Sequence, residues 1–345
     1  MELPLITFIL FAYNQAHYVR EAIEAALAQS YSPLEIILSD DCSQDKTFEI
    51  MKSMAASYKG PHRIILNRNE VNRGVGAHVN KAFSLSSGRW IVTAAGDDVS
   101  DPGRCARVAE LASLHPDAAA IGLGWRDIDA SGAPVSGRML QRYLDARHIS
   151  GMDPGWIRAY RSGDFGVWGM TAAWRSDLIQ GWPTLPDDCR QEDEIYSFRA
   201  ALAGHSMILD PGVYASYRHH DSNASGFDRR TDPDTTERRR TARALMNLKT
   251  WQTLHDELAT LPNLPPGLPS ETMRNELLLI LRRKIAKEHN ESTWWESGIL
   301  TRITRSFFPP ERERPISWPR EWSRMLPRQW HLALETRRQS VAMEK

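Results

Sequence analysis

Short apolar runs alternate with amphipathic segments along the first half of the chain. The runs that predict strands are residues 6–12, 34–39, 63–67, 90–95 and 118–123. After the first run, Val19, Ile23, Ala26 and Leu27 recur with the spacing of one helix face, and a similar pattern follows Thr47. This alternation predicts an α/β fold in which a mostly parallel sheet carries helices on both faces.

Three of the predicted strands end in polar side chains. These side chains are Tyr13, Asn14, Asp40, Asp41, Asp97 and Asp98. The carboxyl ends of parallel strands lie at one edge of a sheet, and ligands bind beyond that edge. Asp and Ser are also frequent turn and N-cap residues, so Ser43 or Asp45, and Ser100 or Asp101, could simply begin the following helices. The convergence of three such ends favours a binding site over capping alone.

Length and composition limit what these ends can bind. The chain has 345 residues, so we expect one large α/β domain with an appendage. Lysine plus arginine equals aspartate plus glutamate, at 43 each, and this balance gives no argument for a nucleic-acid partner. Three cysteines without CxxC spacing suit a reducing compartment and predict neither a disulfide framework nor a zinc site.

The apolar run near the N-terminus predicts a buried strand, because it lacks the basic region and the cleavage site of a signal peptide. No stretch approaches the roughly 20 continuous apolar residues of a spanning helix. We therefore expect a cytoplasmic protein that is at most peripherally attached to the inner face of a membrane.

Two other nucleotide-binding classes lack their motifs. A Rossmann dehydrogenase needs GxGxxG after its first strand, but "AYNQAHY" has no glycine and "NRGVGAHVN" has the wrong spacing. The GxxxxGK[ST] of a P-loop ATPase does not occur.

Two long segments carry an ordered set of further motifs: "FAYNQAHYVREAIEAALAQSYSPLEIILSDDCSQDKTFEIM" and "NRGVGAHVNKAFSLSSGRWIVTAAGDD". The motifs are an aromatic residue with Asn after the first strand, Gln-Ser-Tyr, the box Asp-Asp-x-Ser-x-Asp-x-Thr, an Asn-x-Gly segment, and Gly-Arg-Trp before an acidic turn. With these motifs the chain resembles the family 2 nucleotide-sugar glycosyltransferases, whose GT-A fold contains a Rossmann-like sheet. The resemblance covers about residues 4–225. It implies a GT-A domain at residues 1–228, with a nucleotide-binding half at about 1–100 and an acceptor half at about 101–228.

The resemblance implies nucleotide contacts around the first acidic box. Asp40 or Asp41 would accept a hydrogen bond from the base imide or from a hydroxyl. Because a carboxylate only accepts, a uracil-like edge suits it best. The other positions that match nucleotide contacts are Ala12, Tyr13, Asn14, Asn72, Gly74, Asn80 and Asp97.

A metal site is also implied. The family's second box, Asp-x-Asp, coordinates a divalent cation that bridges the two phosphates, but the matching triplet here begins with Ala95. Asp97 and the adjacent Asp98 remain as ligands, while the ribose contacts made by the first acid are left without a partner. One carboxylate suffices in principle for Mg²⁺, which keeps waters and phosphate oxygens, and Mn²⁺ also accepts histidine. We therefore expect Mn²⁺ or Mg²⁺ as cofactor.

A histidine from the segment "YASYRHHDSNAS" completes this set. His220 matches the family's histidine that reaches the diphosphate or the metal, and His219 is a spacer. The alternative is a polar loop with two exposed histidines. Arg218 could contact phosphate or lie at the surface.

The resemblance assigns the catalytic base to Asp193, in "DDCRQEDEIYSFRAALAG". Removal of the acceptor proton requires such a group, although an acidic first helical turn is also favoured by the helix dipole. The region "GDFGVWGMTAAWRSDL" is expected to be an exposed loop leading to a strand. There Trp168 and Gly169, together with Glu192, would bind the acceptor, and Trp174 would belong to the core.

Residues 229–345 predict a mainly helical C-terminal extension. Two amphipathic helices are joined by the proline-rich "TLPNLPPGLPS". The following stretch, residues 293–330, combines aromatic and basic side chains. It could contact an anionic membrane in plane, dock a partner or second subunit, or pack as a helical cap on the first domain.

The sequence thus predicts a metal-assisted, inverting glycosyltransferase that adds one sugar, because the Gln-x-x-Arg-Trp motif and the spanning helices of processive synthases are absent. The donor would be a nucleoside diphosphate sugar, with UDP favoured and dTDP as alternative. The acceptor would be a saccharide or a lipid-linked saccharide in cell-surface polysaccharide biosynthesis. The competing hypothesis is a non-catalytic protein of the same fold that binds sugar or assists assembly.

Overall fold

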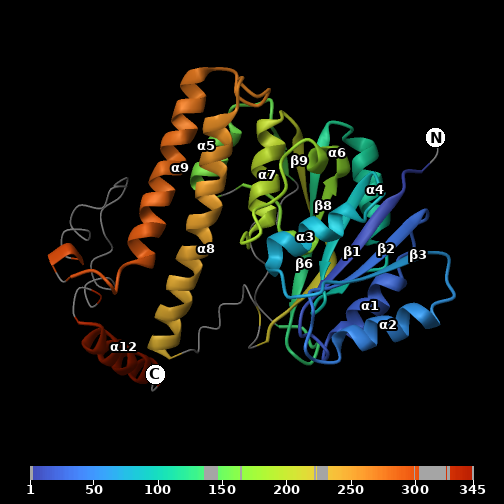
Figure 1. The fold of residues 1–345 in the computed structure, drawn as a ribbon, viewed down its shortest axis with the longest axis horizontal. Helices are drawn as coiled ribbons and strands as arrows, with labels where there is room; N and C mark the ends of the chain where they lie inside the picture. Colours follow the sequence, from blue (N-terminus) through green and yellow to red (C-terminus); the bar gives the residue numbers. More distant parts are fainter. Residues whose placement is uncertain are drawn as a thin grey trace. The chain divides into compact units, whose positions relative to one another are not determined.

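A computed structural model describes residues 3–135, 147–163, 165–220, 223, 232–298, 300–302, 324 and 327–343. The chain forms two compact units (Figure 1). The first contains Met1–Gly226 and Leu261–Arg274, and the second contains Phe227–Thr260 and Asn275–Lys345. The proline-rich connection, which we expected within the C-terminal extension, therefore belongs to the first unit.

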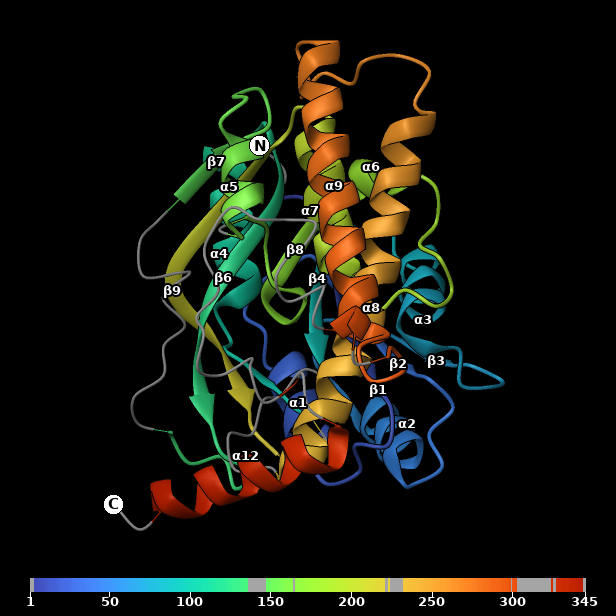
Figure 2. The same cartoon turned by 90° about the vertical axis from the view of Figure 1, so that its left-hand side faces the viewer.

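The first unit is built on one nine-stranded sheet in the order β3-β2-β1-β4-β8-β6-β9-β5, with β7 paired to β9. The strands are β1 (Ile6–Ala12), β2 (Leu34–Asp40), β3 (Arg63–Arg68), β4 (Trp90–Ala95), β5 (Val99–Ser100), β6 (Ala118–Ile128), β7 (Arg147–Ser150), β8 (Ala172–Arg175) and β9 (Ser206–Arg218). Strands β1, β2, β3, β4, β6 and β9 run in one direction, and the other three run against them. The mostly parallel sheet is confirmed, and the carboxyl ends of β1, β2, β4, β6 and β9 share one edge (Figure 2).

Helices cover both faces of this sheet. One face carries α1 (Val19–Leu27), α2 (Thr47–Ser57) and α4 (Arg104–Leu114), which share a core with Ile6, Phe8 and Leu10 of β1. The other face carries α3 (Gly74–Ser84), α6 (Ser176–Gln180) and α7 (Glu192–Leu202). There Phe11 of β1 contacts the rings of His78 and Phe83. The alternation of side chains along β1 explains both layers, since successive residues point to opposite faces.

Most strand boundaries agree with the sequence to within a residue, but two expectations fail. Strand β6 extends to Ile128, beyond the predicted end at 123, because it stays paired with β9 across bulges. The segment before β8 is not an exposed loop, since Phe165 and Val167 are buried. Trp174 is fully buried in the core, as expected.

The second unit contains the helices α8 (Pro233–Thr260), α9 (Glu271–Ser292, whose first turn belongs to the first unit) and α12 (Arg328–Met343). A buried ionic cluster joins them: Arg324 donates to Glu237 at 3.2 Å and to Glu291 at 2.7 Å, and His331 lies 3.4 Å from Glu237. Although burial opposes ionisation, the hydrogen bond from His331 and the charge of Arg324 lower the pKa of Glu237 to about 2. The predicted pair of amphipathic helices is confirmed, whereas most of the aromatic and basic stretch lies outside the described residues.

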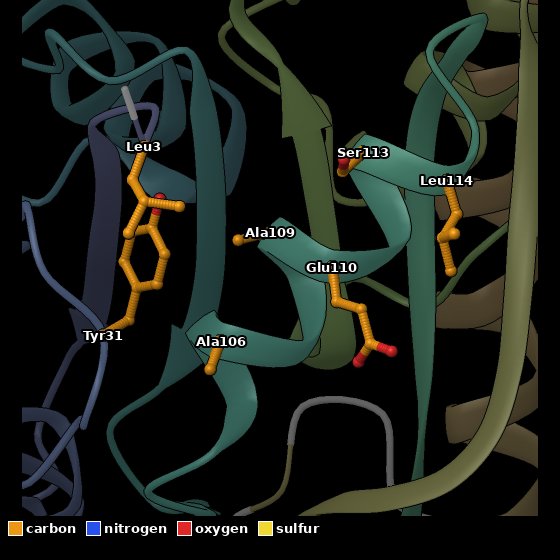
Figure 3. A pocket seen from close by; sticks show the side chains of 7 residues that line it. All are labelled: Leu3, Tyr31, Ala106, Ala109, Glu110, Ser113 and Leu114. Carbon is orange, nitrogen blue, oxygen red and sulfur yellow. The ribbon is translucent and has the colours of Figure 1, made fainter. Parts of the chain in front are cut away.

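No helix in the described ranges is long and apolar enough to span a membrane. A shallow, mainly apolar pocket is lined by residues that include Leu3, Tyr31 and Leu114 (Figure 3). Because Leu3 precedes β1, this pocket lies at the amino end of that strand, away from the edge where the polar strand ends converge.

Candidate active site

The acidic box at the end of β2 clamps the loop after β1 through Ser43, Asp45 and Thr47. The consecutive backbone N–H groups of residues 14–16 donate to Ser43 Oγ, Thr47 Oγ1 and Asp45 Oδ2 at 2.8, 2.8 and 3.0 Å. Asp45 Oδ1 also accepts from the N–H of Thr47 at 2.9 Å, at the start of α2. Asp45 thus forms a turn just before α2, whose N-cap is Lys46, and the clamp fixes the loop that leads into α1.

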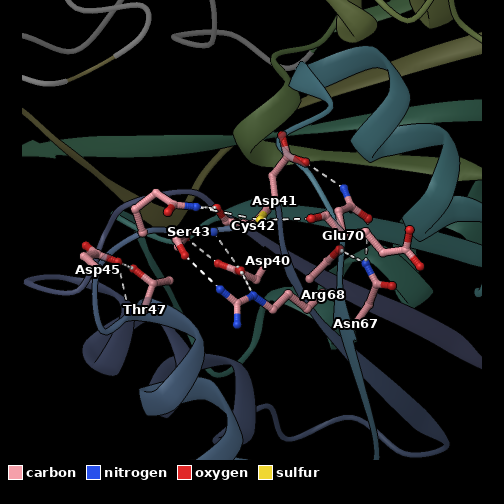
Figure 4. A network of polar contacts seen from close by, with 12 residues as sticks. Asp40, Asp41, Cys42, Ser43, Asp45, Thr47, Asn67, Arg68 and Glu70 are labelled. Atoms are coloured by element: carbon pink, nitrogen blue, oxygen red, sulfur yellow. Dashed lines mark hydrogen bonds and ion pairs between the residues drawn. The ribbon is translucent and has the colours of Figure 1, made fainter.

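The two acids of this box have different environments (Figure 4). Asp40 is fully buried, where it accepts from the N–H and Oγ of Ser43, and Arg68 Nε lies 3.4 Å from it. Asp41 accepts from Asn69 Nδ2 at 2.7 Å and from the N–H groups of Arg73 and Gly74, each at 2.9 Å. These three bonds leave about one of the four lone-pair positions of the Asp41 carboxylate for a ligand.

Among the other expected nucleotide contacts, one offers an exposed aromatic side chain and three have oxygen atoms that already accept hydrogen bonds within the protein. Tyr13 is exposed at the end of β1, whereas the carbonyl of Ala12 accepts from the N–H of Asp41 at 3.0 Å. Asn14 Oδ1 accepts from Gln44 N–H, and Asn72 Oδ1 accepts from Gly74 N–H.

Asn80 also has a structural role. Its amide exchanges hydrogen bonds of 2.8 and 3.0 Å with the backbone of Leu185, so it holds the segment before α7. These two bonds use one of the two N–H donors and one of the two acceptor lone pairs of the amide.

The second acidic turn brings together residues that are far apart in sequence. His220 Nε2 lies 3.0 Å from Asp97 Oδ2. Asp98 Oδ1 accepts from the N–H of Arg218 at 2.9 Å, and Asp98 Oδ2 is buried without a hydrogen-bond partner among the described residues. Burial, and then the negative charge of Asp97, raise the pKa of Asp98 well above that of an ordinary aspartate.

Arg218 is neither a phosphate contact nor a surface residue. It is buried, and it donates from Nε to the carbonyl of Asp97 at 2.8 Å and from Nη2 to Glu21 at 2.5 Å. The ring of Tyr18 stacks on His220 with the centroids 4.6 Å apart, and the Arg218 guanidinium lies 5.1 Å above Tyr18. The role of Tyr18 was not predicted from the sequence. The available signal was its spacing of three residues from Glu21, which places both side chains on one helix face.

The alternative of two exposed histidines is also wrong. The His220 side chain is buried, and His219 Nε2 lies 3.1 Å from Asp127 Oδ1. Only His220 faces the acidic turn.

The residues at this turn fit a hard divalent cation. A buried carboxylate oxygen without a partner, a second carboxylate and an imidazole are suitable donors for Mn²⁺ and, without the imidazole, for Mg²⁺. Within the described ranges no three His, Cys, Asp or Glu side chains could hold a metal ion by themselves. The set therefore suits a cation whose remaining ligands are phosphate oxygens and water.

The expected base lies at the same edge, at the start of α7. Asp193 Oδ2 accepts from the N–H of Gly169 at 3.0 Å, and Asp193 Oδ1 accepts from the N–H of Glu194 at 2.9 Å. The carbonyl of Gly169 in turn accepts from Thr93 Oγ1 of β4 at 2.5 Å. The structure thus brings together the predicted Asp193 and Gly169 and ties both to the strand that precedes Asp97.

Glu192 lies against the same glycine, because a Cβ on Gly169 would come within 2.5 Å of Glu192 Oε1. Burial, and then the charge of Asp193, raise the pKa of Glu192 to about 8. The Trp168 ring packs against Trp125 of β6, with the centroids 5.5 Å apart. Trp125 was missed, because a tryptophan within an apolar strand has no feature that separates it from core residues.

Part of the chain matches a known protein family. Residues 7–165 match the family model described as glycosyl transferase family 2. The chain is 35% identical to EpsE of Bacillus subtilis over 129 residues, 37% of this chain and 46% of EpsE. It is 34% identical to the succinoglycan biosynthesis protein ExoO of Rhizobium meliloti over 145 residues, 42% of this chain and 38% of ExoO. The chain therefore spans less than half the length of these two relatives.

Two solved structures share the fold. TarS 1–349 of S. aureus in complex with UDP-GlcNAc matches with a TM-score of 0.55 and 15% identity, over 93% of this chain and 79% of that chain. The mannosyltransferase PcManGT of Pyrobaculum calidifontis, in complex with GDP-Man and Mn²⁺, matches with a TM-score of 0.56 and 16% identity, over 97% and 87%. The chain is thus similar to glycosyl transferase family 2 over residues 7–165, and the unit that contains them has the expected GT-A fold.

Proposed function

We propose that the protein is a glycosyltransferase that moves one sugar from a nucleoside diphosphate donor to a hydroxyl of a saccharide or lipid-linked saccharide, with inversion at the anomeric carbon. The observation that carries the proposal is the convergence of Asp41, of Asp97 with His220, and of Asp193 on one sheet edge. Asp41 would accept a hydrogen bond from the nucleotide base, Asp97 and His220 would hold a cation, and Asp193 would accept a proton.

The donor end is assigned to the box after β2. The remaining lone pair of Asp41 would accept from the imide N–H of uracil, and the exposed Tyr13 ring would lie beside the base. UDP is the favoured nucleotide and dTDP is the alternative, since thymine has the same imide. The UDP-GlcNAc complex of TarS supports this donor class.

The cation site is assigned to Asp97, Asp98 and His220. A bound Mn²⁺ or Mg²⁺ would neutralise the charge that develops on the leaving diphosphate. The complex of PcManGT with Mn²⁺ supports the same cofactor class.

The acceptor end is assigned to the start of α7. Two backbone N–H groups orient the Asp193 carboxylate, which would take the proton of the attacking hydroxyl. Glu192, with its pKa raised to about 8, keeps a proton at neutral pH and would donate to an acceptor oxygen. Trp168 and Gly169 would form the adjoining surface for the sugar ring.

A role in cell-surface polysaccharide biosynthesis is supported by the similarity to the succinoglycan biosynthesis protein ExoO. The alternative is a non-catalytic protein of this fold that binds sugar or assists assembly, and Ala95 in place of an acid favours it. The joint presence of Asp97, Asp193 and His220 argues for the enzyme.

The test is transfer from a panel of nucleotide sugars in the presence of Mn²⁺, with saccharide and lipid-linked acceptors. We expect one donor to react and NMR to show an inverted anomeric configuration. Asp193→Asn should lower kcat/KM by about 10²- to 10⁴-fold while donor binding persists. The matched control is Asp187→Asn, an exposed acid of the same segment, which should keep full activity. Sugar binding without transfer, unchanged by Asp193→Asn, would instead support the binding protein.

A further inference from the structure

The side chain of Gln15 has a buried polar atom that the fold does not use. Its backbone is fixed: the N–H donates to Thr47 Oγ1 at 2.8 Å, and the carbonyl accepts from the N–H groups of Tyr18 and Val19, each at 2.9 Å. Oε1 is buried and has no hydrogen-bond partner in the part of the chain that the structure describes. A buried acceptor without a donor is unfavourable, because its lost hydrogen bond to water is not replaced. Such an atom on a loop with a fixed backbone is therefore a candidate acceptor for a ligand's donor group.

This oxygen lies directly beside the turn that precedes Asp97. A Cβ on Gly96 would come within 2.6 Å of Gln15 Oε1 and within 2.8 Å of the Ala12 Cβ. The Ala12 Cβ cannot rotate away, so it excludes a side chain at position 96, and the Gln15 amide lies against the same bare glycine. The neighbouring Ala95 offers only a methyl group, and the Phe11 carbonyl of β1 is occupied by the N–H of Gly96 at 2.8 Å. Gln15, in the loop after β1, therefore brings a side-chain acceptor without a partner among the described residues to this turn.

The order of the strands defines which part of a nucleotide would meet Gln15. Strand β1 lies between β2, which ends at Asp40, and β4, which precedes Asp97. Neighbouring strands are about 4.8 Å apart, so the end of β1 is midway between the base end and the phosphate end of the site. In a nucleoside diphosphate the sugar links the base to the phosphates. A nucleotide with its base at Asp41 and its diphosphate at Asp97 must therefore place its ribose over the end of β1.

We propose that Gln15 Oε1 accepts a hydrogen bond from a ribose hydroxyl of the donor nucleotide and makes the site selective for it over the corresponding deoxynucleotide. This inference rests on the proposed function, because it assumes that a nucleoside diphosphate occupies the edge. A neutral amide suits the place, since it accepts from a hydroxyl without adding negative charge beside Asp97, Asp98 and the diphosphate. If the hydroxyl is the 2′ group, the same contact favours UDP over dTDP.

The test measures nucleotide affinity by calorimetry with the full chain and Mn²⁺, using UDP, 2′-deoxy-UDP and 3′-deoxy-UDP. The intact protein should bind UDP about tenfold more tightly than one of the two deoxy compounds. Gln15→Met keeps the size of the side chain but removes the amide. This variant should bind UDP about tenfold more weakly than the intact protein does, and its affinity for the deoxy compound should be unchanged.

The matched control is Gln44→Met. Gln44 lies on the adjacent loop and its amide donates to the carbonyl of Cys42, so this variant should discriminate as the intact protein does. Thermal unfolding of each variant shows that it is folded.

The outcomes separate the inference from the function on which it rests. If the intact protein binds UDP but treats both deoxy compounds alike, or if Gln15→Met still discriminates, a water molecule satisfies Oε1 and the inference is overturned while the function stands. If the intact protein binds no nucleotide at all, the proposed function is wrong, and so is the inference that depends on it.

Discussion

The imidazole of His220 contacts Asp97 Oδ2 in the candidate cation site and the ring of Tyr18 beside it. Both contacts hold the imidazole in one orientation. Tyr18 is thereby a positioning residue, because its ring contacts His220, the proposed metal ligand, and not the cation.

We expect His220→Ala to weaken Mn²⁺ binding at least tenfold, because it removes a proposed metal ligand. Tyr18→Leu should weaken Mn²⁺ binding by a smaller factor than His220→Ala. Partners that orient metal ligands typically change metal affinity by 10- to 100-fold. Tyr18→Phe retains the stacked ring and should bind Mn²⁺ as the intact protein does. Electron paramagnetic resonance of free Mn²⁺ in the presence of UDP measures this directly. Equal affinity in Tyr18→Leu and Tyr18→Phe would show that the stack does not position His220.

Glu192 gives the protein a pH dependence of known sign. Its pKa is about 8 in the folded protein against a usual value of 4.5, so between these pH values the folded state keeps a proton that the unfolded chain has released. The free energy of unfolding therefore falls as the pH rises through this window, by at most about 1.4 kcal/mol per pH unit from this group. Glu192→Gln has no proton to lose, so its stability relative to the intact protein should increase from pH 5.5 to pH 8.5. Urea unfolding at both pH values measures the difference, and a constant difference would contradict the assignment.

At the scale of secondary-structure elements, the loop after β1 depends on the box after β2. Thr47→Val keeps the volume of the side chain but leaves the N–H of Gln15 without its acceptor. We expect a loss of about 1–3 kcal/mol in the free energy of unfolding. Thr47→Ser keeps the hydroxyl and is the control. Urea denaturation distinguishes the two, and equal stability of both variants would show that the clamp does not stabilise the loop.

The sequence predicted these elements well because strands and helices leave a local period in the chain. It did not predict the clamp, since Ser43, Asp45 and Thr47 bond to residues 29 to 32 positions away and their pattern equally suits simple capping. The contact between Asp97 and His220 spans 123 positions, and only the ordered family motifs pointed to it. The burial of Arg218 was missed for a related reason, because a sequence does not show which charged side chains will find several acceptors inside the protein.

At the scale of the whole molecule, the first unit is completed by a segment that follows α8 in the chain. Within that segment Gly267 donates from its N–H to the carbonyl of Leu202 at 2.8 Å, and its carbonyl accepts from Trp156 Nε1 at 3.1 Å. A Cβ at this position would lie 1.8 Å from the carbonyl oxygen of Ala201. The segment therefore packs closely on the end of α7.

We expect Gly267→Ala to destabilise the first unit by about 1–3 kcal/mol, because the added methyl group forces the segment away from α7. Gly298→Ala, at a position with open space around it, should leave stability unchanged. Differential scanning calorimetry measures both. A Gly267→Ala variant that unfolds at the temperature of the intact protein would show that the segment is not part of the first unit.

The path of the chain through residues 261–274 also bears on how such a protein can change by recombination. A gene cut at codon 226 would encode all the strands of the sheet but not the segment that holds the end of α7. The shortest continuous fragment that encodes a complete first unit runs to residue 274 and necessarily carries α8 with it. Any continuous fragment that contains the whole first unit therefore also contains α8, so the extension can be exchanged without cutting the first unit only after residue 274.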